Sequence, residues 1–325
     1  MKAIIFRRYG PPDVCELAEL ERPVPGPKQV LVEVRAASIN AKDSHLRSAD
    51  VAMIRLMGMG LFRPKDQRLG TDLAGRVAAV GSEATRFKLG DEVFGFGHGS
   101  FAEYACADED LLARKPSGAS FEAAAALPIA ALTALQALRD KGRVESGQRV
   151  AIQGASGGVG GFAVQLAKCF GAEVTAVCSS RNLDMARSLG ADRVVDYARV
   201  DFAAGDPRYD LILGINGYRP IRDYRRALAA KGCYVWVGAA SSRLMPAMLQ
   251  SSVLGPLYSK EGGQRLLSLG AARANSEDLA FLGELLGAGK IKSIIDRTYP
   301  LAETAAAFRH FEYEHARGKV VISLA

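Results

Sequence analysis

The most informative pattern of apolar and polar positions lies between residues 149 and 178. A short apolar run at 150–152 predicts a buried strand, and a glycine-rich turn follows it at 154–160. Apolar residues then recur at helical spacing until Gly171, after which 173–178 has the pattern of a second strand. Strand, glycine turn, helix and strand together predict a βαβ unit, the building block of a parallel sheet.

The glycines of this turn have separate expected roles. Gly157 lets the backbone approach a pyrophosphate, and Gly160 lets the helix pack closely on the strand. The helix start then offers unpaired N–H groups and a positive dipole end to phosphate. Because a strand and a helix flank the turn, we predict a dinucleotide site rather than a βα turn without a ligand. The predicted phosphate-binding residues are Ala155, Ser156, Gly157, Gly158, Val159 and Gly160.

The residues after the second strand indicate which dinucleotide binds. An NAD site has Asp or Glu there, which accepts a hydrogen bond from the ribose 2′-hydroxyl. This chain has instead Ser179, Ser180, Arg181 and Asn182. The nearest acid that follows, Asp184, lies inside the next predicted helix. An arginine without a neighbouring carboxylate favours a 2′-phosphate, so we predict NADPH as the cofactor; a solvated, helix-entry role for Arg181 is the alternative.

The first part of the chain, residues 1–120, has the pattern of short strands rather than of helices. We expect these strands, with glycines between them, at 3–6, 30–34, 75–80, 92–96 and 102–105. Many short strands separated by glycine turns predict a small barrel.

The pattern changes after Ser120, an expected N-cap for an alanine-rich helix at 121–139 that Pro128 should kink. From 149 to about 240 strands and helices alternate, which predicts a doubly wound parallel sheet. The tail has no obvious core of its own, so we expect it to return to the first domain. The predicted domains are 1–120 with 262–325, and 121–261.

Further elements follow from the same patterns. Strands are expected at 194–195, 211–213, 234–237, 293–295 and 319–324. Helices are expected at 221–230, 277–286 and 301–314.

Composition narrows the class of protein. The 325 residues are 49% apolar and 24% charged, which is typical of a globular chain of two domains. The N-terminus reaches Arg7 and Arg8 too early for a signal peptide, and the longest apolar stretch, 123–138, is too short to span a membrane. Scattered cysteines suit reduced thiols, so we expect a cytoplasmic protein. The basic residues behind the net charge of +7 are spread out, which does not favour nucleic-acid binding.

Stretches spread over nearly the whole chain resemble the zinc-independent medium-chain dehydrogenase/reductases, in the quinone oxidoreductase (zeta-crystallin-like) branch. They are SINAKDSHLRS at 38–48, LGTDLAGRV at 69–77, GDEV at 90–93, GSFAEYA at 99–105, SFEAAAALP at 120–128 with TALQAL at 133–138, GASGGVG at 154–160 and GKVVISL at 318–324.

The resemblance implies an α/β protein with two kinds of domain. One is a GroES-like β-barrel catalytic domain, and the other is a Rossmann cofactor domain with a doubly wound parallel sheet. The nicotinamide would lie in a cleft between them. Relatives often form homodimers through the edge of the Rossmann sheet, which implies strand addition at Cys233–Val237 in this chain.

The resemblance also implies roles for individual residues. Asn40 and Asp43 lie in the motif of the nicotinamide end, and Thr133 would contact the nicotinamide. Ser179 and Tyr197 match positions that hold the 2′-phosphate in the NADPH-using branch.

The chain departs from the family pattern at three places. Asn182 stands where relatives carry lysine, so Arg181 is the expected basic residue of the phosphate site. His45 replaces a tyrosine that many quinone reductases have. Gly214 stands where the fourth strand of the sheet usually ends in Asp, and Asn216, just beyond it, completes the predicted cofactor-binding residues.

No metal is predicted. A zinc-dependent relative has Cys near position 40 and His–Glu after Gly70, whereas this chain has Asn40, Thr71 and Asp72. A catalytic zinc needs about three protein ligands and an open position. Only Asp72 remains as a ligand of that kind.

Without zinc the motifs contain no Lewis acid for alcohol chemistry, so the predicted reaction is hydride transfer to a quinone or an α,β-unsaturated carbonyl. Our hypothesis is that Asn40 orients the acceptor or cofactor and His45 donates a hydrogen bond or proton, with Asp43 as the third candidate. The alternatives are a turn-capping asparagine and an exposed loop histidine. Asp43 and Arg47 are expected to pair and brace the loop.

Other interpretations stay open from the sequence. An enoyl-thioester reductase is the alternative enzyme, and a non-catalytic NADPH- or RNA-binding protein is the alternative from another class. The methionine-rich segment 51–63 is either a packing loop or a lid over an apolar substrate.

Overall fold

The chain divides into two compact units in a computed structural model. The structure describes all residues except 50–59, 61, 205–207, 218, 239–245, 251–254, 261–262, 315 and 325. The unit called here the β-rich unit is Met1–Leu132 with Arg273–Ala325, and the parallel-sheet unit is Thr133–Ala272. Both limits lie further along the chain than the predicted 120/121 and 261/262, and the first falls inside helix α4 (Pro128–Gln136).

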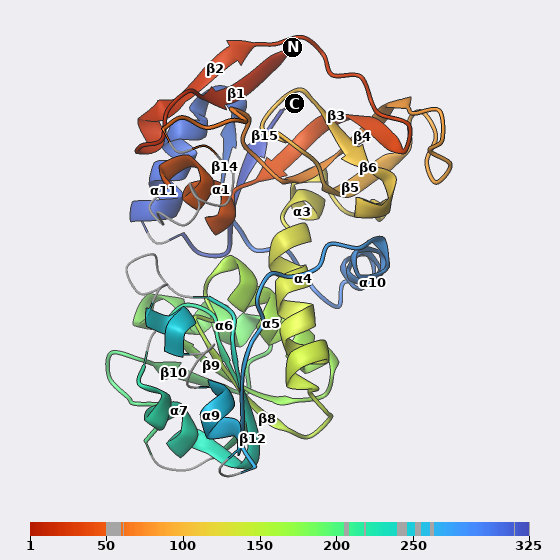
Figure 1. The fold of residues 1–325 in the computed structure, drawn as a ribbon. Helices are drawn as coiled ribbons and strands as arrows, with labels where there is room; N and C mark the ends of the chain where they lie inside the picture. The colour runs from red at the N-terminus through yellow and green to blue at the C-terminus, as the bar shows by residue number, and fades with distance from the viewer. Residues whose placement is uncertain are drawn as a thin grey trace. The chain divides into compact units, whose positions relative to one another are not determined.

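Antiparallel strands form most of the β-rich unit (Figure 1). Strands β1 (Lys2–Phe6) and β2 (Cys15–Glu19) pair as a ribbon. The strands of the larger sheet in the described residues are, in order, β14 (Ile295–Pro300), β15 (Lys319–Ser323), β3 (Gln29–Ser38), β4 (Asp72–Val80), β5 (Glu92–Phe96) and β7 (Leu112–Arg114), with β6 (Tyr104–Asp108) paired to β3.

The predicted strands of this unit are confirmed where apolar residues alternate. Val30, Val32 and Val34 on β3 are almost wholly buried, because they point to one face and pack on the core. The strand predicted at 293–295 is misplaced, since the structure has β14 from Ile295 to Pro300. This strand has mostly exposed side chains at the end of the sheet, so polar residues form it and an apolar pattern does not reveal it.

The helices of the β-rich unit follow their predicted caps. Helix α3 (Phe121–Ala125) begins after Ser120, whose hydroxyl accepts from the Ala123 N–H at 3.1 Å. The single helix predicted at 121–139 is divided in the structure, since α3 ends at Ala125 and α4 starts at Pro128, the position of the expected kink. The tail adds α10 (Ser276–Gly287) and α11 (Thr304–Tyr313). The edge-to-face rings of Phe101 and Phe308, 6.0 Å apart, join α11 to the core.

All strand pairs of the second sheet are parallel in the part of the chain that the structure describes. Their order is β10 (Arg193–Asp196), β9 (Glu173–Cys178), β8 (Arg149–Gln153), β11 (Tyr209–Gly214), β12 (Leu228–Trp236) and β13 (Arg265–Ser268). In sequence numbering this is the order 3-2-1-4-5-6 of a doubly wound nucleotide-binding sheet, as predicted. Its order reverses between β8 and β11.

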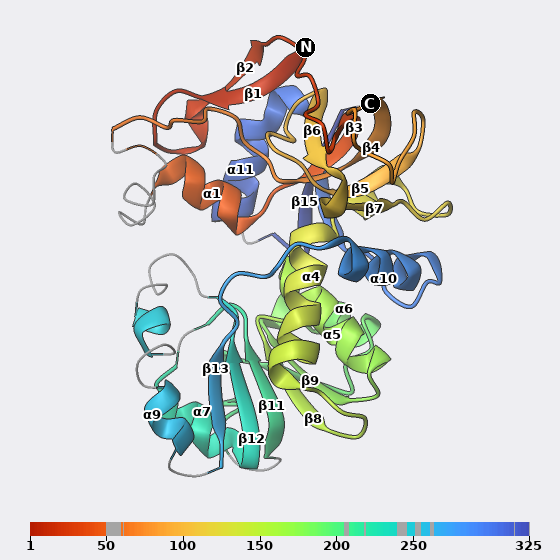
Figure 2. The same ribbon diagram turned by 45° about the vertical axis from the view of Figure 1, so that its right-hand side comes forward.

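Helices cover both faces of this sheet. Figure 2 shows α7 (Ile221–Ala227) and α9 (Gly255–Lys260) on one side, and α5 (Gly158–Cys169) and α6 (Leu183–Ser188) on the other. The helix predicted to reach residue 230 is too long, because the chain enters β12 at Leu228.

The predicted sheet edge at Cys233–Val237 is wrong. Those residues belong mainly to β12, which has β11 on one side and β13 on the other. The short β13 was missed because Arg265–Ser268 is too short to show an alternating pattern. Among the described strands, β13 is therefore the edge on this side of the sheet.

Candidate functional site

The carboxyl ends of four parallel strands lie in register in the parallel-sheet unit. Gln153, Gly214, Trp236 and Ser268, the last residues of β8, β11, β12 and β13, form one row across the sheet. Ligands of open α/β sheets bind outside such an edge, at the point where the strand order reverses. That point is between Gln153 and Gly214.

The glycine turn lies beside this point and has the packing that a dinucleotide fingerprint requires. A Cβ at Gly160 would overlap the carbonyl oxygen of Gly154, so only glycine lets α5 approach β8 so closely. A Cβ at Gly157 would meet nothing nearer than 3.7 Å, which leaves its outer side open. Gly154 has a positive φ of 87° and lies against Asn216 of the β11 loop. The predicted turn and the predicted Asn216 are therefore brought together.

The start of α5 can bind an anion through its backbone. Its N-cap, Gly157, has no side chain to accept from the first helical N–H groups, which have no acceptor within the helix. The helix is long enough for its dipole to place partial positive charge at this end. Ser156, Gly158 and Val159 lie in the same turn and fit a pyrophosphate through N–H groups rather than through charged side chains, whereas the Ala155 N–H already donates to the Val177 carbonyl at 3.2 Å.

The end of β9 brings together most of the predicted 2′-phosphate residues. The Tyr197 N–H donates to the Cys178 carbonyl at 3.2 Å, which puts Tyr197 beside Ser179. Ser180 and Arg181 follow on an exposed 3₁₀ turn, and the Tyr197 side chain is 59% exposed. These residues therefore lie near the same end of the β9–β10 pair, and their binding of a 2′-phosphate stays a prediction.

Asp196 is a member of this cluster that the sequence analysis missed. The Ser180 hydroxyl donates to its carboxylate at 2.5 Å, and Arg199 lies 3.6 Å away. The hydrogen bond from Ser180 lowers the pKa of Asp196, so a negative charge stands next to the predicted phosphate site. The sequence analysis looked for a carboxylate only directly after β9, whereas Asp196 ends β10 and comes beside Ser180 through the β9–β10 pairing.

Asn182 and Thr133 have a less direct connection to the predicted cofactor site. Asn182, which stands where relatives carry lysine, is buried and donates to the Ser179 hydroxyl at 3.0 Å. It therefore braces the turn rather than presenting an amide outward. Thr133 is half-buried on α4, and no described contact puts it beside the glycine turn.

A second polar cluster lies in the β-rich unit, where several elements converge. Ser38 ends β3, Asp72 begins β4 opposite it, and Lys319 begins β15. Helix α1 (Ala41–Ser48) starts directly after β3, with Asn40 as its N-cap. The polar run at 38–47 is therefore mostly a helix, and Asn40 stands at its N-cap position.

Hydrogen bonds saturate the Asn40 side chain almost completely. Its amide nitrogen donates to the Ser38 carbonyl at 3.2 Å and to Asp72 at 2.9 Å. Its amide oxygen accepts from the Lys319 ammonium at 2.5 Å. Both N–H donors and one of the two lone pairs of the oxygen are thus in use. Little capacity remains for Asn40 to bind another molecule in this arrangement.

Two buried carboxylates share this cluster with one cation. Asp43 accepts from the Asn40 N–H at 2.9 Å, while the Thr71 hydroxyl lies 3.4 Å away. Burial, followed by the charge of Asp72, raises the pKa of Asp43 to about 7. Asp43 therefore holds a proton near neutral pH more readily than an ordinary aspartate does.

Asp72 has stronger support for its negative charge. It accepts from Ser38 at 3.1 Å and from the Ile129 N–H, in the first turn of α4, at 3.2 Å, and Lys319 lies 3.8 Å away. Burial raises the pKa of Asp72 and lowers the pKa of Lys319, and their mutual attraction opposes both changes. This donor set does not fit zinc, because the neighbours of Asp72 are the Asn40 amide and the Lys319 ammonium rather than further N, S or O ligands of the kind a catalytic zinc needs.

His45 and Arg47 have different surroundings on α1. The His45 ring is half-buried, and its Nδ1 atom is buried without a hydrogen-bond partner among the described residues. Arg47 is 1% exposed and pairs with Glu312 at 2.6 Å, and it also donates to the Gly10 carbonyl. The predicted pairing of Asp43 with Arg47 is therefore wrong: each has a partner on another element.

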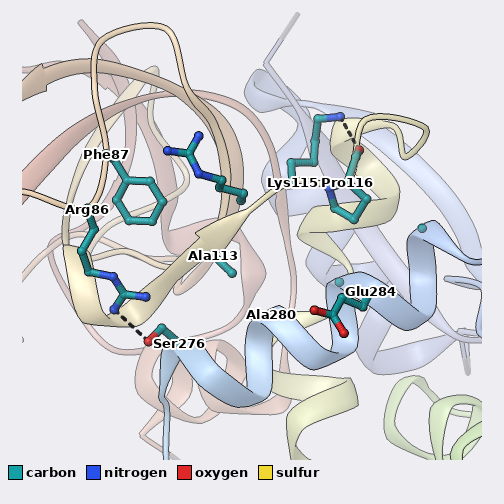
Figure 3. Close-up of a pocket in the computed structure, with 11 residues that line it drawn as sticks. Arg86, Phe87, Ala113, Lys115, Pro116, Ser276, Ala280 and Glu284 are labelled. Carbon is teal, nitrogen blue, oxygen red and sulfur yellow. Dashed lines mark hydrogen bonds between the residues drawn. The ribbon is translucent and has the colours of Figure 1, made fainter.

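A cavity of about 430 Å³ lies elsewhere in the β-rich unit, between β7 and α10 (Figure 3). Arg86 reaches Ser276 at 2.8 Å and Asp110 at 2.8 Å, and Lys115 pairs with Glu92 at 3.0 Å. The cations of this cavity are already neutralised, and Glu284 adds a negative charge to its wall. The described residues that line it include none of the predicted site residues.

Two further features concern the surroundings of these sites. Most of the segment proposed as a lid, 51–63, lies outside the described residues. Within the described part of the chain, no helix combines the length and apolar character needed to cross a bilayer.

Comparison with known proteins identifies both parts of the chain. Residues 26–117 match the alcohol dehydrogenase GroES-like domain, and residues 189–322 match a family described as zinc-binding dehydrogenase. A chloroplast envelope quinone oxidoreductase homolog of Arabidopsis thaliana is 33% identical over 99% of this chain and 98% of its own length.

Solved structures agree with these matches. The quinone oxidoreductase of Coxiella burnetii superimposes with a TM-score of 0.85 at 32% identity and covers 100% of this chain and 99% of its own. The Escherichia coli quinone oxidoreductase complexed with NADPH gives 0.84 at 26% identity and covers 99% of this chain and 100% of its own. The predicted GroES-like domain and Rossmann-type parallel sheet are confirmed. The chain therefore belongs to the medium-chain dehydrogenase/reductase family, among its quinone oxidoreductase-like enzymes.

Proposed function

We propose that the protein is an NADPH-dependent, zinc-independent reductase that transfers hydride to a quinone or an α,β-unsaturated carbonyl. The observation that carries the proposal is the uncapped start of α5 where the order of a parallel sheet reverses. That place suits the pyrophosphate of a dinucleotide. The NADPH bound to the Escherichia coli relative supports the choice of cofactor.

The residues that would hold the cofactor fall into three groups. Within the turn Ala155–Gly160, the N–H groups at the start of α5 would bind the pyrophosphate, since those of Ala155 and Gly157 already donate to Val177 and Gly154. Ser179, Arg181 and Tyr197 would bind the 2′-phosphate, with Ser180 occupied by Asp196. Asn216, beside Gly154, and Thr133, on α4, would serve the nicotinamide end. When bound, NADPH supplies the hydride.

The chain must also stabilise the oxygen of the acceptor as it becomes negative. Such an oxygen needs a nearby hydrogen-bond or proton donor. His45 is a candidate, since its Nδ1 atom has no partner among the described residues. Asn40 and Asp43 would act by holding the start of α1 rather than by touching the acceptor, because their hydrogen bonds are already made.

The deciding experiment measures NADPH oxidation at 340 nm with a panel of acceptors, and NADH in parallel. The panel holds benzoquinone, naphthoquinone, 2-alkenals and crotonyl thioester. Turnover of quinones or alkenals with preference for NADPH is the expected result. Turnover restricted to the thioester would favour an enoyl-thioester reductase. Binding of NADPH without turnover of any acceptor would contradict the proposal.

The role of His45 has its own test. His45→Ala should lower turnover more than tenfold, in line with the typical contribution of a general acid, while NADPH affinity stays as in the wild type. His98→Ala, an exposed histidine elsewhere in the β-rich unit, is the matched control. An unchanged rate for His45→Ala would remove this residue from the mechanism.

Assembly and location belong to the same proposal. We expect a cytoplasmic homodimer, and the strand available for pairing at this end of the parallel sheet is β13 rather than β12. Sedimentation of the wild type beside a variant with Leu267→Pro, which places proline on β13, tests this edge. A dimer that is equally stable in both would rule out the β13 contact.

A further inference from the structure

A chain of hydroxyl and amide groups leads through the parallel-sheet unit to its carboxyl edge. Tyr234 of β12 and Tyr224 of α7 stack with ring centroids 4.1 Å apart, and the Tyr234 hydroxyl donates to that of Tyr224. The Tyr224 hydroxyl in turn donates to the Gln153 amide oxygen at 2.8 Å. Burial raises the pKa of both tyrosines, so both stay protonated donors.

Gly214 makes this chain possible. A Cβ added at Gly214 would lie 2.5 Å from the Tyr234 hydroxyl oxygen. The absence of the aspartate that usually ends the fourth strand is therefore explained by packing: in this chain the Tyr234 hydroxyl takes the space. The two residues form one unit, since neither a side chain at 214 nor a displaced Tyr234 hydroxyl is compatible with the observed contacts.

The hydrogen bond from Tyr224 fixes which way the Gln153 amide points. Because the amide oxygen accepts from Tyr224, the amide nitrogen must lie on the other side, where it rests against Gly217 of the loop after β11. No described residue accepts a hydrogen bond from this nitrogen, and Gln153 is partly exposed. An oriented amide donor therefore stands where the strand order reverses.

Trp236 provides a second donor in the same row. It ends β12, one strand beyond Gly214, and is 7% exposed. Its indole N–H is buried and has no partner among the described residues. A buried indole N–H usually finds a partner, so an unpaired one at a ligand-binding edge indicates that a ligand supplies the acceptor. Gln153 and Trp236 are separated by two strand spacings, about 9–10 Å.

We propose that Gln153 and Trp236 donate hydrogen bonds to the dinucleotide, and that Tyr224 and Tyr234 are positioning residues that hold the Gln153 amide. The inference rests on the proposed function. Both donors are neutral, which suits the carboxamide carbonyl and ribose hydroxyls of the nicotinamide half. Their position agrees, because they lie on the β8–β12 side, whereas the 2′-phosphate residues lie at the end of β9.

The test compares two probes by calorimetry: NADPH, and adenosine 2′,5′-bisphosphate, which lacks the nicotinamide half. Gln153→Met should weaken NADPH binding about fivefold, the change expected for one neutral hydrogen bond, and leave bisphosphate binding unchanged. Trp236→Phe should do the same. Gln153→Glu keeps an acceptor for Tyr224 but loses the N–H, so it provides a folded variant that also lacks the donor.

A double-mutant cycle tests the positioning role. Tyr224→Phe should weaken NADPH binding about twofold to threefold, and adding it to Gln153→Met should weaken binding no further. Tyr313→Phe, an exposed residue of α11, is the control and should bind both probes as the wild type does.

The outcomes separate this inference from the proposed function. Failure of the wild type to bind NADPH would overturn both. NADPH affinity within twofold of the wild type for Gln153→Met and Trp236→Phe would overturn the inference alone. Equal weakening of both probes would also overturn it, because a general disturbance of the sheet would then explain the variants. Additive effects in the cycle would remove Tyr224 from its positioning role.

Discussion

The two units each contain a buried polar cluster, and the clusters differ in what they leave unsatisfied. In the β-rich unit Asn40, Asp72 and Lys319 bond to one another and to backbone groups, with charges of both signs. In the parallel-sheet unit the chain from Tyr234 to Gln153 is neutral and ends in a donor without a described partner. A cluster whose polar groups are hydrogen-bonded to one another has a structural role. An oriented hydrogen-bond donor without an acceptor indicates a place where a ligand binds.

This difference changes which residues we expect to contact a ligand. Asn40 and Asp43 are in the family's motif, yet their contacts hold β3, β4, β15 and α1 together. Gln153 and Trp236 belong to no predicted site, yet they have the unused hydrogen-bonding capacity. The experiments below test the contrast, beginning with the largest expected effect.

The strongest test of the saturated cluster is Lys319→Met. It removes the cation beside Asp72 and leaves a buried carboxylate without its partner, which costs about 3–5 kcal/mol of unfolding free energy. Urea unfolding measures the loss. Lys168→Met breaks the surface pair with Asp192, at 2.7 Å, and should cost at most about 1 kcal/mol. Equal losses in the two variants would contradict the structural role of Lys319.

The pH dependence of stability tests the shared charge of the cluster. The pKa of Asp43 is about 7 in the folded protein and about 3.9 when unfolded, so the folded state binds the proton more tightly. Stability from this group is present at low pH and is lost as pH rises from about 4 to about 7, by up to about 1.4 kcal/mol per pH unit.

Asp43→Asn should therefore flatten the profile of unfolding free energy between about pH 4 and pH 7, the interval between the two pKa values. Asp184→Asn, whose side chain is 99% exposed, is the control and should keep the wild-type slope. A wild-type slope in Asp43→Asn would show that another group titrates in this range.

Gly214→Ala tests the neutral cluster. The new methyl group would meet the Tyr234 hydroxyl at 2.5 Å, and such overpacking costs about 1–3 kcal/mol. The midpoint of thermal unfolding should fall accordingly. Gly118→Ala, where a Cβ meets nothing within 4 Å, is the matched control and should change little. An undisturbed Gly214→Ala would mean that the Tyr234 hydroxyl can move away freely.

The smallest expected effect concerns Asp196. Its charge lies beside the predicted 2′-phosphate residues through Ser180, so Asp196→Asn should favour NADPH over NADH by a few-fold, the size of a modest charge interaction near the surface. The ratio of the two dissociation constants measures this. Asp201→Asn, on the loop after β10, is the control. A shift toward NADH would indicate that Asp196 does not face the ribose.

The sequence predicted much of the fold because local patterns were strong. The run at 150–152, the glycine turn and the strand at 173–178 became β8, the start of α5 and β9 with small shifts. Ser120 caps its helix as predicted. Exposed or very short elements were missed, as β13 and most of β14 show, because their side chains do not alternate between core and solvent.

By itself the sequence determined the family, the glycine turn and the types of residue predicted to bind a cofactor, since these depend on neighbours along the chain. Only the tertiary structure determined which polar groups already have hydrogen-bond partners. Lys319 reaches Asn40 only because β15 pairs with β3, and Asp196 reaches Ser180 only because β10 pairs with β9. Hydrogen-bonding capacity is consumed by residues distant in sequence, so the free donors of Gln153 and Trp236 become visible only after the chain has folded.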